Sequence, residues 1–132
     1  MKKSILVLVL LAFVACKSVK QNSNEVIITF ENEVVLNDYK IVINKIISDS
    51  RCPERTNCIW AGELVIELSV WKNNEMKEIV VLTFSPKTKG ENLEWFEKYI
   101  PQNKKVINYM ISPSKTDKQL ELKDYKIELI LD

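Results

Sequence analysis

Apolar and polar residues alternate along much of the chain beyond residue 25, and the longest such stretch covers residues 59–71. Within it Leu64, Ile66, Leu68 and Val70 occupy every second position, with more polar positions between them. Successive side chains of a β-strand point to opposite faces of the sheet, so this two-residue period predicts a strand with one buried face.

A second apolar run at residues 79–84 follows Asn73-Asn74, and the two together predict a β-hairpin. Further strand patterns lie at residues 26–30, 39–47, 106–111 and 125–131. The alternation in 39–47 changes phase at Ile46-Ile47, and such a change within a strand indicates a bulge or a bend. About seven short strands separated by turn residues predict an all-β fold, an antiparallel β-sandwich.

Two segments near the end of the chain refine this fold class. Residues 93–100 fit either a short helical or irregular segment or a strand, and the preceding residues 85–94 are expected to form a long loop. Tyr125 starts the last strand shortly after Leu122, an arrangement that resembles the tyrosine corner of immunoglobulin-like domains, where the hydroxyl bonds to backbone just upstream. We therefore expect an immunoglobulin-like, Greek-key sandwich.

The N-terminal pattern differs from the rest and predicts export. Lys2 and Lys3 precede an apolar run at residues 5–15, which suits a signal peptide and is too short to span a bilayer. The run ends at Ala15-Cys16, which resembles the lipobox of bacterial lipoproteins, although Phe13 replaces the usual leucine. That resemblance implies cleavage before Cys16 and acylation of its thiol; an ordinary cleaved signal with a free cysteine is the alternative.

This interpretation of the N-terminal pattern divides the chain into three parts. Residues 1–15 are the expected lipoprotein signal peptide, residues 16–25 a polar, flexible tether, and residues 26–132 the β-sandwich domain. Loss of the signal removes two lysines and changes the formal charge from +1 to −1. A nearly neutral chain has no electrostatic reason to bind nucleic acid, so we expect no nucleic-acid partner.

The composition also argues against catalysis and bound cofactors. The chain contains no histidine, so the common serine or cysteine nucleophile with a histidine base is excluded. No phosphate-binding glycine loop is present, because the chain has only two glycines. We expect no enzyme activity, no cofactor and no metal site.

Residues 49–63 hold the two cysteines that remain after acylation of the third. We expect Cys52 and Cys58 to form a structural disulfide, stiffened by Pro53, in a loop between two strands. The alternatives are a metal site or a redox pair. A structural zinc site takes about four protein ligands, which this chain lacks, and reactive dithiols usually have the closer Cys-x-x-Cys spacing.

Several other residues of this segment are candidates for an interaction loop. We expect Trp60 to pack on the disulfide in the core, with an exposed, ligand-stacking aromatic as the alternative. Gly62 indicates a bulge or a close approach of backbone. The charged flank has either a site role or, more in keeping with its position, a bracing role. The candidate interaction residues are Asp49, Arg51, Pro53, Glu54, Trp60 and Glu63.

The whole segment, Asp-Ser-Arg-Cys-Pro-x-x-x-x-Cys-x-Trp-Ala-Gly-Glu, resembles the hallmark of a family of small, mostly uncharacterised bacterial secreted proteins and lipoproteins. Residues 111–113 and 122–125 are similar to the family's C-terminal half. The resemblance implies a β-sandwich domain in the cell envelope. It implies no known activity, so no catalytic residue is transferred.

We therefore expect a lipid-anchored cell-envelope protein that is a non-catalytic binding or structural module. Its partners would be the membrane, through acyl chains on Cys16, and an unknown protein or small molecule. Lys17-Ser18 lack an acidic cluster, which favours a periplasm-facing outer-membrane position over the cell surface. The alternative functions are a protease inhibitor that acts through the disulfide loop, and an enzyme that uses Asp49 and Glu63 as paired carboxylates.

Overall fold

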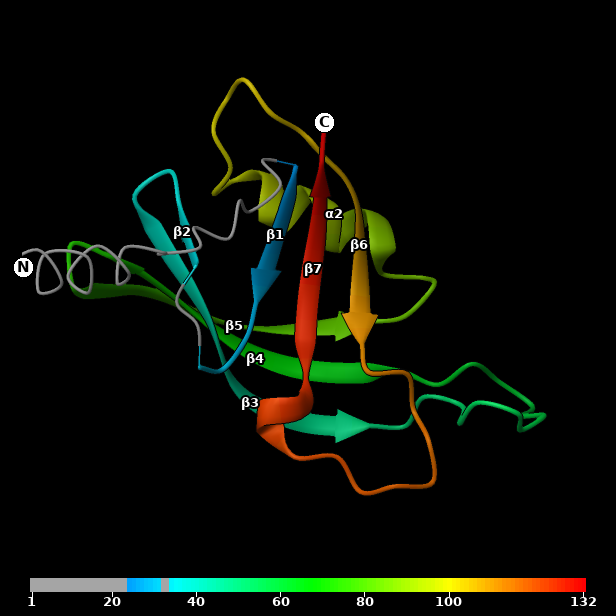
Figure 1. Ribbon diagram of the computed structural model, residues 1–132. Coiled ribbons are helices and arrows are strands. Elements are labelled where there is room, and N and C mark those ends of the chain that lie inside the picture. Colours follow the sequence, from blue (N-terminus) through cyan, green and yellow to red (C-terminus); the bar gives the residue numbers. More distant parts are fainter. Residues whose placement is uncertain (1–23, 32–33) are drawn as a thin grey trace, which may run out of the picture.

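The computed structural model describes residues 24–31 and 34–132, which form two stacked antiparallel sheets and one short helix (Figure 1). The expected signal peptide, Cys16 and nearly all of the tether lie outside the described residues. The elements in chain order are β1 (Glu25–Ile28), β2 (Val34–Leu36), β3 (Tyr39–Asp49), β4 (Leu64–Lys72), β5 (Glu75–Phe84), α2 (Lys89–Glu97), β6 (Val106–Ser112), the single 3₁₀ turn η2 (Leu122–Asp124) and β7 (Lys126–Leu131). The predicted two-sheet, antiparallel β architecture with about seven strands is confirmed.

The larger sheet has the strand order β2-β3-β4-β5 and is built from consecutive hairpins. The predicted hairpin between β4 and β5 turns at Asn73 and Asn74, whose φ angles are 52° and 59°. Asparagine tolerates this left-handed conformation, which matches the twist of the flanking strands. A second hairpin of the same kind, between β2 and β3, turns at Asn37 and Asp38 and was not predicted.

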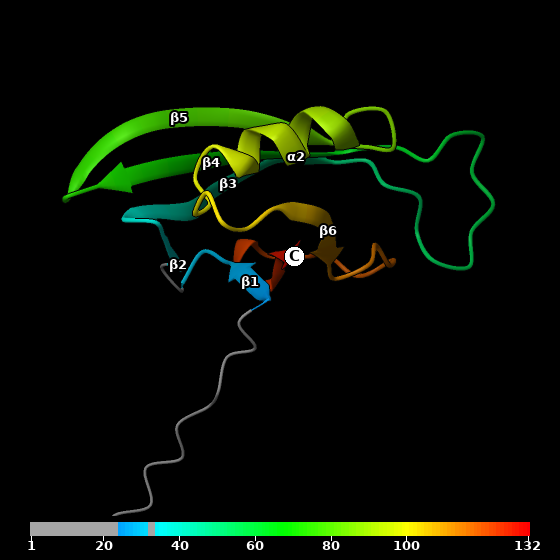
Figure 2. The same cartoon turned by 90° about the horizontal axis from the view of Figure 1, so that it is seen from above.

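The smaller sheet has the order β1-β7-β6, so the last strand of the chain lies between the first strand and the one before it. In Figure 2 this sheet lies below the larger one, and α2 lies beside β5. Every strand of the larger sheet neighbours the next in sequence, which is a meander. At this finer level the strand order differs from an immunoglobulin-like Greek key, in which a strand returns beside the first of the group.

The core lies between the two sheets and is formed by the positions that the alternation marked. Leu64, Ile66, Leu68 and Val70 of β4 are all fully buried, as are Ile127 and Leu129 of β7. The expected bulge in β3 is confirmed: its pairing with β4 shifts register twice, between Ile43 and Lys45 and between Ile46 and Ser48.

The helix α2 corrects the prediction of a long loop over residues 85–94, because helical structure begins at Lys89. Thr88 precedes the helix, and its hydroxyl donates to the Thr83 carbonyl at the end of β5. Trp95 and Phe96 are buried against each other in edge-to-face contact. The ambiguous segment 93–100 is therefore helical as far as Glu97, and its buried aromatic side chains lie at one side of the core. Within the described ranges, no helix is long and apolar enough to cross a membrane.

We expect Ile66→Ala to lower the free energy of unfolding by about 2–5 kcal/mol, because the change opens a cavity in a fully buried position. Urea denaturation of the oxidised protein measures the effect. The matched control Ile107→Ala, at a side chain that is 56% exposed, should change the value by no more than about 0.5 kcal/mol. Equal losses in both variants would contradict the assignment of the core.

Candidate functional site: the disulfide loop and its anchor

The segment between β3 and β4 is a long loop whose base is held closed by backbone hydrogen bonds. The Ser50 amide donates to the Glu63 carbonyl (2.9 Å), and the Cys52 amide donates to the Ala61 carbonyl (3.0 Å). The Ser50 hydroxyl accepts from the Glu63 amide at 3.1 Å. These bonds continue the β3–β4 pairing beyond the strand ends, and the loop beyond them projects away from both sheets (Figure 2).

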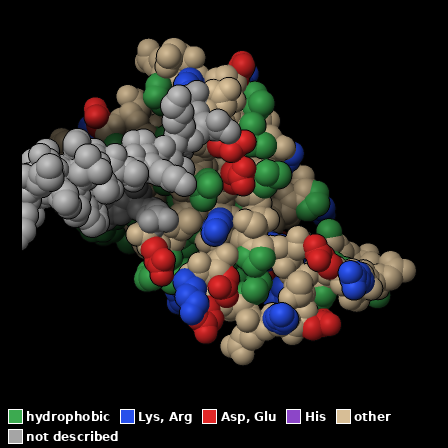
Figure 3. Space-filling view, viewed as in Figure 1, with side chains coloured by type: hydrophobic (Ala, Val, Ile, Leu, Met, Phe, Trp, Pro, Cys, Tyr) green, Lys and Arg blue, Asp and Glu red, His purple; other side chains and the backbone are tan. Residues whose placement is uncertain are grey.

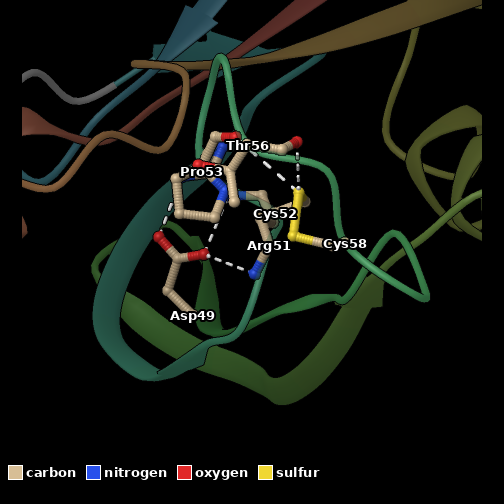
Figure 4. The surroundings of a disulfide bond; sticks show 6 residues. All are labelled: Asp49, Arg51, Cys52, Pro53, Thr56 and Cys58. Carbon is tan, nitrogen blue, oxygen red and sulfur yellow. Dashed lines mark hydrogen bonds and ion pairs between the residues drawn. A yellow bond between two sulfur atoms is a disulfide. The ribbon is translucent and has the colours of Figure 1, made fainter.

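The expected disulfide is present: Cys52 and Cys58 are bonded, with their Cα atoms 5.9 Å apart. Cys52 Sγ also lies 3.3 Å from the carbonyl oxygen of Thr56 (Figure 4). A disulfide sulfur carries no hydrogen, so this is a packing contact inside the ring and not a donated bond. Closing so short a loop contributes about 2 kcal/mol to stability on the chain-entropy argument.

Gly62 makes the close approach of backbone that its position suggested. Its φ angle is +70°, and a Cβ atom there would lie 1.9 Å from the carbonyl oxygen of Ser50. Both the left-handed conformation and the contact exclude a side chain. Gly62 thereby allows the two sides of the loop to run close together.

The carboxylate of Asp49 fastens the loop to the rest of the domain. Arg51 donates through Nε to Oδ1 at 2.8 Å and through Nη2 to Oδ2 at 2.9 Å, a bidentate ion pair (Figure 4). The Tyr125 hydroxyl donates to Oδ2 at 2.9 Å. Only 5% of the Asp49 side chain is exposed. The charged flank of the loop is therefore a brace.

The tyrosine-corner prediction was wrong in its partner. The Tyr125 hydroxyl bonds a carboxylate on another strand and not backbone just upstream. Asp49 is the last residue of β3, whereas Tyr125 directly precedes β7, so this bond joins the two sheets. The two sheets come close at this point. A buried carboxylate needs hydrogen-bond donors, so the Tyr125 hydroxyl bonds to Asp49 and not to nearby backbone.

Pro113 and Lys115, in the segment after β6, complete the anchor and were missed by the sequence analysis. Arg51 Nη1 donates to the Pro113 carbonyl at 3.0 Å, and Lys115 Nζ donates to the Asp49 carbonyl at 3.2 Å. The Glu54 amide donates to the Lys115 carbonyl at 2.8 Å. These partners are more than sixty positions apart in sequence, and no local pattern marks them.

The anchor fixes the charge states of its members. Burial raises the pKa of Asp49, but the hydrogen bonds from Arg51 and Tyr125 and the Arg51 charge outweigh it and lower the pKa from 3.8 to about 2. Burial, followed by the hydrogen bond to Asp49 and its charge, raises the pKa of Tyr125 to about 12. Asp49 thus remains ionised and fully engaged at neutral pH, which leaves it poorly suited to exchange protons.

The expectation that Trp60 packs in the core was wrong. Its side chain is 64% exposed, and the neighbouring Ile59 is completely exposed. The strand that would have turned Trp60 inward begins only at Leu64, so residues 59 and 60 lie on the projecting loop. The alternative of an exposed Trp60 is therefore the one that the structure has, whereas the exposed apolar pair that it forms with Ile59, just after the disulfide, was not predicted.

The remaining candidates lie in the same loop with different roles. The Pro53 carbonyl accepts from the Thr56 amide at 3.2 Å and forms a turn in which Arg55 has a φ of 63°. The side chain of Glu54 is exposed, whereas Glu63 contributes its backbone amide and carbonyl to the loop base. In the part of the chain that the structure describes, no three Cys, Asp or Glu side chains are grouped to hold a metal ion.

No protein-family model, curated protein or solved structure matches this chain. The resemblance of residues 49–63 to a family of small bacterial envelope proteins therefore stays a prediction.

We expect Asp49→Asn to lower the free energy of unfolding at pH 7 by about 2 kcal/mol, because folding surrounds the ionised carboxylate with donors that stabilise its charge. A pKa lowered by folding gives stability that is complete above pH 3.8 and is lost as the pH falls through 2. Wild type and variant should therefore converge toward pH 2 in urea titrations. Asp117→Asn, at an exposed aspartate, is the control. A difference between wild type and Asp49→Asn that stays constant from pH 7 to pH 2 would contradict the anchor.

Proposed function

We propose that this protein is a lipid-anchored cell-envelope module that binds a partner protein through the exposed apolar residues of its disulfide loop. The observation that carries the proposal is the contrast within the loop. Its base is fixed by the Asp49 anchor and the disulfide, while Ile59 and Trp60 at its projecting part are exposed to solvent.

An exposed tryptophan on a firmly held loop is better explained by binding to a partner than by a contribution to the stability of the fold. A tryptophan in water forgoes the large apolar burial that it would gain in a core or an interface. Tryptophan is also enriched among the few residues that dominate binding energy at protein interfaces. A loop that is already ordered loses little conformational entropy on binding, so more of the contact energy appears as affinity.

A non-catalytic role is supported by the state of the charged residues. Both carboxylate oxygens of Asp49 accept hydrogen bonds from Arg51 or Tyr125, which leaves little capacity for a reacting group. The chain also lacks histidine, the most common general base. The paired use of Asp49 and Glu63 in catalysis therefore finds no support in this arrangement.

The position of the loop agrees with attachment to the membrane at the other end of the domain. The Leu131 amide, at the end of β7, donates to the Asn24 carbonyl at 2.8 Å, so the chain enters the domain there. Tyr125, which holds the loop base, directly precedes β7. β7 has six residues and spans about 20 Å. Acyl chains on Cys16, joined through the expected flexible tether, would thus hold the domain at the membrane, in the periplasm, with the base of the loop about 20 Å from the point where the chain enters.

The membrane anchor predicts a specific effect of Cys16→Ser. Two or more acyl chains hold a protein stably at a bilayer, so removing the acylation site should release the chain from membranes. We expect cells grown with a palmitate analogue to label the wild type but not the variant, and the variant to appear in the soluble envelope fraction. Label that persists on Cys16→Ser would contradict lipidation at this residue.

The loop predicts a contact at position 60. We expect a photo-crosslinking amino acid placed there in the full chain, in the source cells, to give a discrete adduct that is lost with Cys52→Ser/Cys58→Ser. The same amino acid at position 107 is the control, because Ile107 is similarly exposed but lies on β6. Trp60→Ala should weaken binding of the captured partner about thirtyfold, if Trp60 carries about 2 kcal/mol. No discrete adduct at position 60 would refute the binding role of the loop.

The same experiment separates the alternative of a protease inhibitor. The exposed segment 56–58 lies in the disulfide ring outside any helix or strand, a form that a protease cleft can accept. An inhibitor would give an adduct with a protease, and the purified chain would lower the activity of that protease at micromolar concentration. A captured partner without protease activity excludes this alternative.

A further inference from the structure

The outer edge of β5 is the longest free edge of the larger sheet. β5 has ten residues, whereas β2, the strand at the opposite edge, has three. An edge strand presents backbone N–H and C=O groups that another strand can pair with, and long apolar edges are usually covered. Ile79 and Val81 of β5 are 53% and 51% exposed, so the middle of this edge is apolar and open.

The helix α2 covers only the C-terminal end of that edge. The Thr83 carbonyl accepts hydrogen bonds from the Thr88 hydroxyl and from Asn92 Nδ2 (2.9 Å), so it points away from β4. Because backbone groups in a strand repeat every second residue, those of Val81 and Ile79 point the same way. In the described part of the chain, no loop, helix or side chain hydrogen-bonds to them. Figure 2 shows β5 extending well beyond α2.

A groove of about 370 Å³ lies where the open edge meets the helix. Val81 and Thr83 line it from β5, and Asn92 and Trp95 line it from α2. The Trp95 side chain is 93% buried, yet none of the described residues accepts a hydrogen bond from its indole Nε1. A buried donor without an acceptor costs free energy, so the packing of Trp95 beside this groove is not fully satisfied.

We propose that an extended segment of a partner polypeptide adds to β5 as a fifth strand, pairing with Ile79 and Val81 and ending in the groove against α2. Two donors and two acceptors in the plane of a sheet are matched by another strand and not by a compact ligand. The incoming segment would place alternate side chains over the exposed Ile79 and Val81. This surface is separate from the disulfide loop, and the proposal does not depend on the function proposed for that loop.

The charges beside the groove indicate the composition of the segment. Glu91, Glu94 and Lys98 of α2 line it and are exposed, so its rim carries one net negative charge. A segment with lysine or arginine between apolar residues fits this rim. A second copy of the chain fits poorly, because the only lysine of its β5, Lys77, already pairs with Glu75 at 2.6 Å. Glu78 leaves that strand with one net negative charge, so antiparallel β5–β5 pairing would bring like charges together at the rim.

The test uses the full chain, with its disulfide oxidised, in detergent micelles and followed by amide NMR. The probe is a capped peptide of alternating valine and lysine. Its controls are the same peptide with alternate amides N-methylated and a peptide with glutamate in place of lysine. We expect the valine–lysine peptide to shift saturably the signals of the Ile79 and Val81 amides and of the Trp95 indole. N-methylation should weaken binding by about tenfold or more, because it removes backbone hydrogen bonds.

A protein variant checks the same bonds from the other side. Val81→Pro removes a donor that points away from β4, so the internal pairing keeps its bonds while peptide affinity falls; Val81→Thr is the matched control that retains it. If Val81→Pro fails to fold, the N-methylated peptide decides alone. Equal affinity for both backbones, tighter binding of the glutamate peptide, or no shift at millimolar peptide would overturn the proposal. So would a doubled sedimentation mass without peptide, which would assign the edge to a second copy.

Discussion

The structure depends most on a single buried carboxylate. Asp49 ends β3 in the larger sheet, accepts a hydrogen bond from Tyr125 just before β7 of the smaller sheet, and forms a bidentate pair with Arg51 in the loop. Three parts of the molecule therefore meet at one charged group. A buried charge of this kind is tolerated only when its donors are all in place, so the anchor also fixes how the sheets meet. Figure 3 shows that acidic and basic side chains are otherwise mixed over this face.

The loop combines several constraints that act at different levels. The Asp49 anchor and the backbone bonds at Ser50 hold its base, Gly62 lets its two sides approach, and the disulfide closes its outer part. The anchor lies outside the covalent ring formed by Cys52 and Cys58. The two devices therefore stabilise different lengths of the same loop, and neither substitutes for the other.

Local patterns in the sequence were sufficient for much of the fold. Alternation in β4 identified its buried face, Asn73-Asn74 identified a hairpin, and the phase change at Ile46-Ile47 identified irregular pairing. The β2–β3 hairpin was missed although Asn37-Asp38 carries the same turn signal, because the strand before it is only three residues long.

The site was less accessible to such reasoning. The cysteine pairing and the tight approach at Gly62 follow from local chemistry and were predicted correctly. The bond from Tyr125 to Asp49 and the exposure of Trp60 depend on where the sheets meet and where β4 begins, which no period in the sequence encodes.

The order of the strands has a mechanical consequence. A pull between Asn24 and Tyr125 would act along β1 and β7, across hydrogen bonds that lie perpendicular to both strands. All hydrogen bonds between β1 and β7 would be loaded together in shear, so the domain would resist being stretched between these two residues.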